Sequence, residues 1–288
     1  MKKSLLLVIS LFVAFGFVLG GCGSSKSSTA GNKVTVLKGI GKIKKNAKLY
    51  HSLPSRIKKA NVIMNGIDDS YPPMDFRDDN NNLTGFDIDI DKALSAKLGV
   101  TIKNVPTDWN GVIPSLQSKK FDMILSAMGI TKERAKSVSF SKPYFLGGMT
   151  IIVNKADKQS SGIKSGKDLK GKAVGVELGS QAVIDYVDSI KGVKSVKKYD
   201  SATEALQDLA NKRINAYVDD FEVANYYMQK VPGKYAKVIL NIKEPYGIAF
   251  RKNDSQLQNA VQKAFDELKE EGVLSKISEK WFKYDIYK

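Results

Sequence analysis

Residues 87–125 read DIDIDKALSAKLGVTIKNVPTDWNGVIPSLQSKKFDMIL, and this stretch decides the fold class. Apolar residues recur at helical spacing from Asp87 to Leu98, and a short strand-like run follows from Ile102 to Val105. A second helical pattern around Ile113 to Ser118 then leads into the apolar run Met123 to Leu125. Because helices and strands alternate in this way, the stretch predicts an α/β fold.

The alternation continues on both sides of this stretch. It begins at the apolar run Val62 to Met64, and a second series opens at Thr150 to Val153. Further strands are expected at residues 173–176, 214–218, 237–240 and 246–250, and further helices at residues 181–189, 202–210, 257–269 and 275–282. The two series predict two α/β lobes. We place lobe 1 at residues 53–150 and 246–288, and lobe 2 at residues 151–245.

The N-terminus predicts export and a lipid anchor. Two lysines precede an apolar run from Leu5 to Leu19, about 15 residues long and shorter than the roughly 20 of a membrane-spanning helix. The run ends in Leu19-Gly20-Gly21-Cys22, the pattern of a lipoprotein signal peptide. We therefore expect removal of residues 1–21 and a diacylglycerol on Cys22, which would hold the protein on the extracytoplasmic face of the cell membrane.

The positive charge is concentrated near the N-terminus. The chain has 46 lysines and arginines, 30 acidic residues and a formal net charge of +16. Residues 22–60 contain ten of the cations and no Asp or Glu, and Lys2 and Lys3 precede them. The remaining 34 cations and 30 acidic residues give residues 61–288 a net charge of only +4. This distribution disfavours nucleic-acid binding and suits a basic tether at residues 22–52 beside an anionic membrane surface. A merely soluble linker is an equally good interpretation of that segment.

The residue types that support thiol, metal or histidine chemistry are scarce. Cys22 is the single cysteine, so a disulfide framework and any metal site that needs two thiolates are excluded. The single histidine, His51, lies ahead of the predicted lobes. We expect neither a metal nor an organic cofactor.

Five motifs resemble one protein family in their order and spacing. They are DDSYPPMDF at 68–76 with GFDIDI at 85–90, WNGVIPSLQS at 109–118, FDMI at 121–124, ITKERA at 130–135 and FSKPYF at 140–145. Over residues 53–288 the chain resembles the polar amino-acid-binding proteins of ATP-driven (ABC) importers, solute-binding protein family 3. The resemblance implies a type II periplasmic-binding-protein fold, whose two lobes are joined by crossover strands at 147–155 and 244–252. It also implies a monomer that captures a free amino acid and delivers it to a membrane permease, without catalysis.

The resemblance assigns the two charged groups of an amino acid to two residues. Arg134 falls on the family's carboxylate-binding arginine, and the planar guanidinium is suited to grip both oxygens of a carboxylate. Asp220 falls on the family's ammonium-binding carboxylate, just after a predicted strand, where open α/β sheets bind ligands. Asp220 also suits the N-cap of the following helix, and the neighbouring Asp219 is a weaker candidate for ligand contact.

Other matched positions form the walls of the expected site. Tyr71 and Trp109 match the aromatic pair that covers the ligand's side chain, where a π face packs on apolar carbons and attracts a cation. The backbone groups of five residues are expected to contact the ligand's polar groups: Ser126, Ala127, Gly129, Ser180 and Gln181. Gly129 departs from the family, whose members commonly carry Ser or Thr there, so a hydroxyl contact is missing.

The matched side-chain pocket is acidic. Asp68 and Glu177 fall on positions that the family directs at the ligand's side chain, and Asp219 lies nearby without a matching extra Lys or Arg. Enclosing an acidic ligand there would place uncompensated like charges in a dry site. The site therefore favours a cationic amino acid such as arginine, lysine or ornithine, with glutamine, cystine and histidine as polar alternatives.

Two other functions remain open from the sequence. The same fold hosts dehydratases, and Glu177 is an acid that such an enzyme would use, but the pairing of Arg134 with Asp220 matches an intact amino acid better. A surface sensor or adhesin that keeps the binding fold is the other alternative. An adjacent permease and ATPase gene would favour transport over sensing.

The lipid anchor is tested by substitution of Cys22. Because this residue supplies the chain's only thiol, Cys22→Ala should abolish incorporation of labelled palmitate and leave the signal peptide uncleaved by the lipoprotein peptidase. Cys22→Ser is the matched control for side-chain size and should behave in the same way. Palmitate labelling of either variant would contradict the assignment.

Overall fold

The computed structural model describes residues 33–157, 160 and 162–288. The predicted signal peptide and the lipidation site Cys22 lie outside the described residues. Within the described part of the chain, no helix is both long enough and apolar enough to cross a membrane.

The first of two five-stranded sheets, sheet 1, has the strand order β7-β3-β8-β15-β9. Its strands are β3 (Val62–Ile67), β7 (Thr101–Pro106), β8 (Met123–Ile124), β9 (Val138–Phe140) and β15 (Ala249–Arg251). The strands β7, β3 and β8 are parallel, whereas β15 runs antiparallel to both β8 and β9. Sheet 1 therefore combines the first α/β series with a strand from near the C-terminus.

Sheet 2 has the order β12-β11-β13-β10-β14. Its strands are β10 (Phe145–Asn154), β11 (Ala173–Glu177), β12 (Ser195–Tyr199), β13 (Ala216–Asp220) and β14 (Tyr235–Tyr246). The sequence analysis missed β12, an edge strand in which Lys197 and Lys198 are exposed and only Tyr199 is buried. Lysines are typical of protected sheet edges, and they hide the alternation of apolar residues by which strands are recognised.

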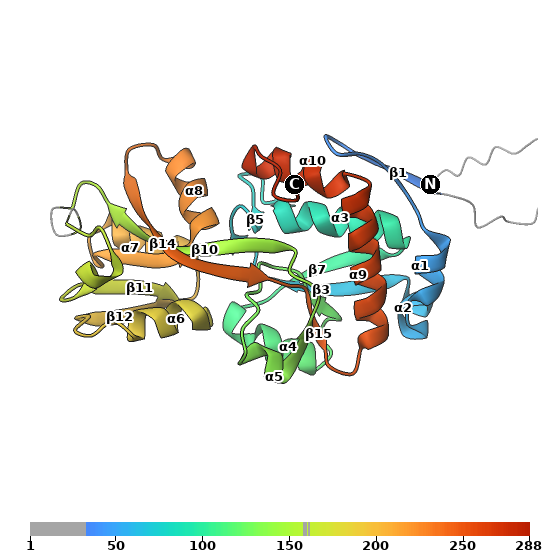
Figure 1. The fold of residues 1–288 in the computed structure, drawn as a ribbon, viewed down its shortest axis with the longest axis horizontal. Helices are drawn as coiled ribbons and strands as arrows, with labels where there is room; N and C mark the ends of the chain where they lie inside the picture. The colour runs from blue at the N-terminus through green and yellow to red at the C-terminus, as the bar shows by residue number, and fades with distance from the viewer. Residues whose placement is uncertain (1–32, 158–159, 161) are drawn as a thin grey trace, which may run out of the picture. The chain divides into compact units, whose positions relative to one another are not determined.

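Two long strands connect the sheets (Figure 1). β10 and β14 are antiparallel partners from the pair Phe145↔Tyr246 to the pair Asn154↔Tyr235. After β14 the chain turns at Gly247 and enters β15, so the single strand expected at 246–250 is divided between two sheets. β10 lies at the first expected crossover, whereas the second, expected at 244–252, contains only the end of β14 together with β15.

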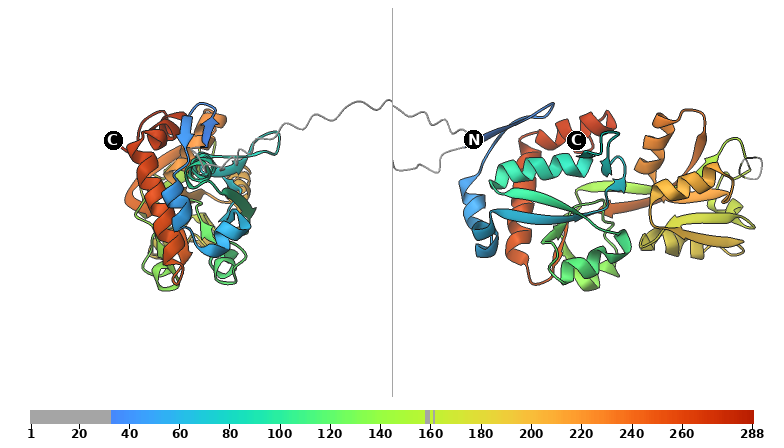
Figure 2. Two further views of the ribbon diagram at one scale, coloured as in Figure 1. Left: turned by 90° about the vertical axis from the view of Figure 1, so that its right-hand side faces the viewer. Right: turned by 180° about the vertical axis from the view of Figure 1, so that it is seen from behind.

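Helices cover the sheets on both sides (Figures 1 and 2). α3 (Phe86–Leu98) is buried over most of its length, and it ends at Gly99, whose positive φ of 70° suits a helix C-cap. The remaining helices and short elements are α4 (Val112–Gln117), α5 (Arg134–Ser137), α6 (Gln181–Asp188), α7 (Ala202–Ala210), α8 (Phe221–Lys230), α9 (Ser255–Glu270), α10 (Val273–Phe282), the 3₁₀ helices η1 (Trp109–Gly111) and η2 (Gly166–Leu169), and the small sheet of β4 (Ser70–Tyr71), β5 (Asp75–Arg77) and β6 (Leu83–Thr84).

The prediction of a tether at residues 22–52 is wrong for its second half. The hairpin β1 (Val34–Leu37) and β2 (Gly41–Lys44) is followed by α1 (Ala47–Ser52) and α2 (Ser55–Ala60). β1, β2 and α1 pack on α3, α1 also packs on α9, and α2 packs on β3, so the segment lies on the side of sheet 1 away from sheet 2 (Figure 2). Ile43 is fully buried and Leu49 nearly so. The segment is poor in apolar residues, and Ile40, Ile43 and Leu49 pack into one core, whereas Val34 and Val36 are exposed.

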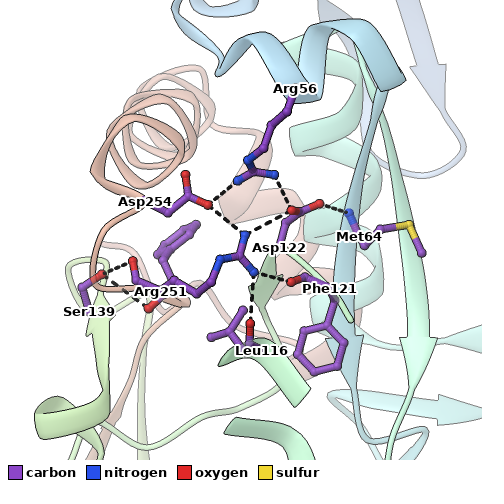
Figure 3. Close-up of polar contacts among 9 residues, drawn as sticks. Arg56, Met64, Leu116, Phe121, Asp122, Ser139, Arg251 and Asp254 are labelled. Carbon is purple, nitrogen blue, oxygen red and sulfur yellow. Dashed lines mark hydrogen bonds and ion pairs between the residues drawn. The ribbon is translucent and has the colours of Figure 1, made fainter. Parts of the chain in front are cut away.

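A network of two arginines and two aspartates fastens this N-terminal segment to sheet 1 (Figure 3). Arg56 of α2 pairs with both Asp122 and Asp254. Arg251 donates to Asp254 Oδ2 over 2.9 Å and to Asp122 Oδ1 over 3.3 Å. Its other terminal nitrogen donates to the carbonyls of Leu116 and Phe121. The network joins segments that are far apart in the sequence.

The two arginines should differ in their effect on stability. Arg251→Ala leaves two carbonyls and two largely buried carboxylates with fewer donors, and should lower the free energy of unfolding by about 3 kcal/mol, as for the breaking of a buried pair. The Arg56 side chain is 44% exposed, so Arg56→Ala should cost about 1 kcal/mol or less. Urea denaturation of each variant measures both values. Equal losses would contradict this ranking.

Candidate functional site

The carboxyl ends of strands from both sheets meet at one place. Asp68 follows β3, Ser126 follows β8, Glu177 ends β11 and Asp220 ends β13. A cavity here is lined by thirteen residues: Asp68, Tyr71, Trp109, Ser126, Ala127, Gly129, Arg134, Glu177, Ser180, Ala182, Val183, Asp220 and Glu244. Ten of the twelve residues predicted from the sequence are among them.

Arg134 bridges the two sides of the cavity. It begins α5, and its two terminal nitrogens donate to the carbonyls of Gly129 and Gly179, each over 3.0 Å. Its guanidinium also lies over the Trp109 ring, 5.6 Å from the ring centroid. Gly179 has a φ of 90°, and a Cβ there would lie 3.0 Å from Asn110 Cα, so glycine is needed for this close approach. Burial lowers the pKa of Arg134, and nearby carboxylates oppose that shift.

Tyr71 joins the two adjacent aspartates through its hydroxyl. The hydroxyl oxygen lies 2.6 Å from Asp220 Oδ2 and 3.0 Å from Asp219 Oδ1, and Tyr246 donates to the same Asp220 oxygen. Burial raises the pKa of both aspartates, that of Asp219 to about 7 with a further contribution from the charge of Asp220. The sequence suggested the aromatic face of Tyr71, whereas this polar link from β4 to β13 was not predicted.

Asp68 and Glu177 face each other from opposite sheets. Asp68 Oδ1 accepts hydrogen bonds from the backbone N–H and the hydroxyl of Ser70, both 2.8 Å long. Glu177 Oε2 accepts one from the Ser180 hydroxyl over 3.1 Å. Burial raises the pKa of each carboxyl group, and the charge of Asp68 raises that of Glu177 further.

Buried polar side chains behind the cavity fix the loop after β8. Asp87 Oδ2 accepts hydrogen bonds from the Ala127 N–H over 2.8 Å and from the Tyr144 hydroxyl over 2.7 Å. Ala127 has a φ of 44°, an uncommon conformation for a residue with a Cβ, and these contacts hold it there. Its N–H is therefore directed at Asp87, whereas the sequence analysis expected it to serve the ligand. Burial raises the pKa of Asp87 to about 7.

Two predicted residues do not line the cavity. Asp219 is buried beside it and reaches the site through Tyr71. Gln181 is exposed, its side-chain amide donates to Asp185, and its backbone N–H donates to the carbonyl of Gly179 over 2.9 Å. The first turn of α6 therefore contributes Ala182 and Val183 to the cavity in place of Gln181.

Glu244 is the polar lining residue that the sequence analysis missed. It lies in β14 opposite Gly147 of β10. Burial, with the charge of Asp220 as a smaller cause, raises its pKa to about 8, and Arg134 opposes the shift. The glycine at position 129, where a hydroxyl side chain was expected, was the sequence signal for such a residue, because a missing side chain leaves space for another. The identity of the occupant depends on strand pairing, which the sequence does not give.

The electrostatic character of the cavity is strongly acidic. Four of its lining residues are Asp or Glu, and Arg134 is the cation among them. No group of three or more Asp, Glu, His or Cys side chains in the described part of the chain is arranged to hold a metal ion. The arrangement can bind a molecule that offers one carboxylate and several N–H donors.

Comparison with known proteins places these features in a family. The sequence model of bacterial extracellular solute-binding proteins, family 3, matches residues 63–284. The L-cystine-binding protein TcyJ of Escherichia coli K12 is 34% identical, and the match covers 82% of this chain and 88% of that protein. The arginine-binding extracellular protein ArtP of Bacillus subtilis is 33% identical over 98% of both chains.

A solved structure agrees with the fold. An ancestral arginine-binding protein bound to glutamine is 43% identical, with a TM-score of 0.73, and the match covers 77% of this chain and 98% of that one. This similarity confirms the two-lobed type II periplasmic-binding fold that the sequence predicts. By sequence and by structure, this chain belongs to the bacterial extracellular solute-binding proteins of family 3.

Proposed function

We propose that this protein captures a free basic or polar amino acid outside the cell and delivers it to the permease of an ABC importer. One observation carries the proposal: a buried cavity between two sheets has a guanidinium on one side and a carboxyl group on the other. These are Arg134, at the start of α5, and Asp220, at the end of β13. An amino acid carries the complementary pair of charges on two groups that are bound to the same carbon atom.

The polar groups of the cavity suit this ligand backbone. A guanidinium has five N–H donors, of which Arg134 uses two for the carbonyls of Gly129 and Gly179, so others remain for a carboxylate. Asp220 Oδ1 is buried without a hydrogen-bond partner among the described residues. Because a buried acceptor without a donor is costly, a ligand ammonium at this oxygen would stabilise the closed arrangement.

The side-chain end of the cavity favours a cation or a donor of hydrogen bonds. Glu177 Oε1 is buried without a hydrogen-bond partner among the described residues, and the carboxyl of Asp68 lies across from it. A ligand such as arginine or lysine would offset their mutual repulsion, whereas a third carboxylate would increase it. The naming of similar proteins for arginine and cystine supports the same class of ligand.

The predicted lipid at Cys22 completes the proposal. It would keep a monomeric binding protein on the extracytoplasmic face of the cell membrane, near the permease to which the ligand is passed. Binding without catalysis is supported by the match of Arg134 and Asp220 to the two charged groups of an unaltered amino acid.

The roles of Arg134 and Asp220 are tested by truncation. Removing one member of a buried charged contact costs about 2 to 5 kcal/mol, so Arg134→Ala and Asp220→Ala should each weaken amino-acid binding by at least roughly 30-fold. Lys136→Ala, in the same short helix, is the control because that side chain is 71% exposed, and its affinity should equal that of the wild type. Isothermal titration calorimetry measures all three. Near-native affinity in either truncated variant would remove that residue from the proposed site.

Ligand selection is tested by charge and by pH. Arginine or lysine should bind at least about 100-fold more tightly than glutamate at neutral pH, and Glu177→Gln should narrow that gap.

A bound cation favours the ionised carboxyls, so their pKa values are lower in the complex than in the free protein. The affinity for arginine should therefore be greatest at a pH above the raised pKa values of these carboxyls. It should fall from pH 8 to pH 5, as the pH passes the pKa of about 7 of Asp219. Affinity for neutral glutamine should change less, and a preference for glutamate would contradict the assignment.

A further inference from the structure

Glu244 occupies the space that a side chain at position 129 would take. An ideal Cβ on Gly129 would lie 1.8 Å from Glu244 Oε1 and 2.7 Å from its Cδ, far inside any real contact. The φ of Gly129 is outside the left-handed region, so the backbone does not require glycine there. The Glu244 carboxyl group fills that space instead, so a side chain at position 129 would require this carboxyl group to move, and we treat Gly129 and Glu244 as a pair.

The backbone around this pair is held in place on both sides. Gly129 forms an isolated β-bridge with Tyr246, and the N–H of Ile130 donates to the carbonyl of Pro245 over 2.8 Å. Glu244 itself pairs with Gly147 of β10. The carboxyl group therefore enters the cavity from a strand that is fixed against both the loop after β8 and the other crossover strand.

The charges around Glu244 identify what it can bind. Arg134 directs two N–H groups at the carbonyls of Gly129 and Gly179, and its positive charge lowers the pKa of Glu244 against the larger effect of burial. Asp220 acts on Glu244 as a like charge, and Asp220 Oδ1 has no hydrogen-bond partner among the described residues. Two carboxyls that line the same cavity are best stabilised by a cation with several N–H donors.

We propose that Glu244 is a specificity-determining residue whose carboxylate, admitted by Gly129, binds the α-ammonium group of the ligand together with Asp220. Its carboxyl group occupies the space that a side chain at position 129 would take. The inference rests on the proposed function, because it assigns a further contact to the same ligand. Its consequence is that the site demands a charged α-amino group more strongly than a site with a neutral hydroxyl.

Paired ligands test this demand directly. Arginine and 5-guanidinopentanoic acid differ by the α-amino group alone, so we would titrate both into the wild type and into Glu244→Gln by calorimetry. Glu244→Gln should weaken arginine binding by at least about tenfold, a loss of about 1.4 kcal/mol, and leave the analogue unchanged. The control is Glu133→Gln, which removes the same charge from a 71% exposed position and should alter neither affinity.

Position 129 supplies the second arm of the test. Gly129→Ser alone should weaken arginine binding, because the new side chain collides with the Glu244 carboxyl. Gly129→Ser with Glu244→Ala should bind more tightly than either single variant, since the hydroxyl then occupies the emptied space.

Proton release on arginine binding, measured at pH 7.5 in two buffers of different ionisation enthalpy, should decrease in Glu244→Gln, because the pKa of Glu244 is about 8 before binding.

The outcomes separate this inference from the proposed function. If arginine, lysine, glutamine and cystine all fail to bind the wild type, the proposed function is wrong and the role of Glu244 falls with it. If the wild type binds one of them but Glu244→Gln leaves its affinity unchanged, the inference alone is overturned. An equal loss for arginine and its deamino analogue would also overturn it, because that result assigns Glu244 a merely structural role.

Discussion

The pairing of β10 with β14 is the constraint on which the rest of the structure depends. β10 is ten residues long and β14 is twelve residues long, and they pair from Phe145↔Tyr246 to Asn154↔Tyr235. This pair of strands links the two sheets. Because each sheet presents the carboxyl ends of its parallel strands to the cavity, the link brings Asp68 and Glu177 face to face. It also places Glu244, near the end of β14, in the same cavity as Arg134.

A cavity built in this way concentrates charge that folding alone would avoid. Burial raises the pKa values of Asp68, Glu177 and Asp220, and the charges of Asp68, Asp219 and Asp220 raise that of Glu177 further. The positive charge of Arg134 offsets part of this negative charge, but two of its N–H donors already bind backbone carbonyls. A ligand that supplies further N–H donors would therefore stabilise these buried carboxyls most.

Sequence reasoning succeeded where the signal is local. The alternation of residues 87–125 predicted the α/β fold, and short motifs placed Arg134 and Trp109 in one cavity. It failed where the signal depends on partners far away in the chain. The buried residues Ile43 and Leu49 lie in a segment whose composition indicates a tether, because composition averages over the few positions that pack. Similarly, the exposed side chain of Gln181 follows from the direction of one helix turn, which a motif match does not fix.

The departure at Gly129 shows how such a gap in sequence reasoning is closed. The sequence predicts only a missing hydroxyl contact at this position, because it shows the residue and not its neighbours in space. The strand ladder supplies the neighbour, since Glu244 lies one pair beyond Pro245, whose carbonyl accepts the N–H of Ile130. A glycine with an ordinary φ inside a crowded cavity is therefore evidence for a second residue, and here that residue carries a charge where the hydroxyl carried none.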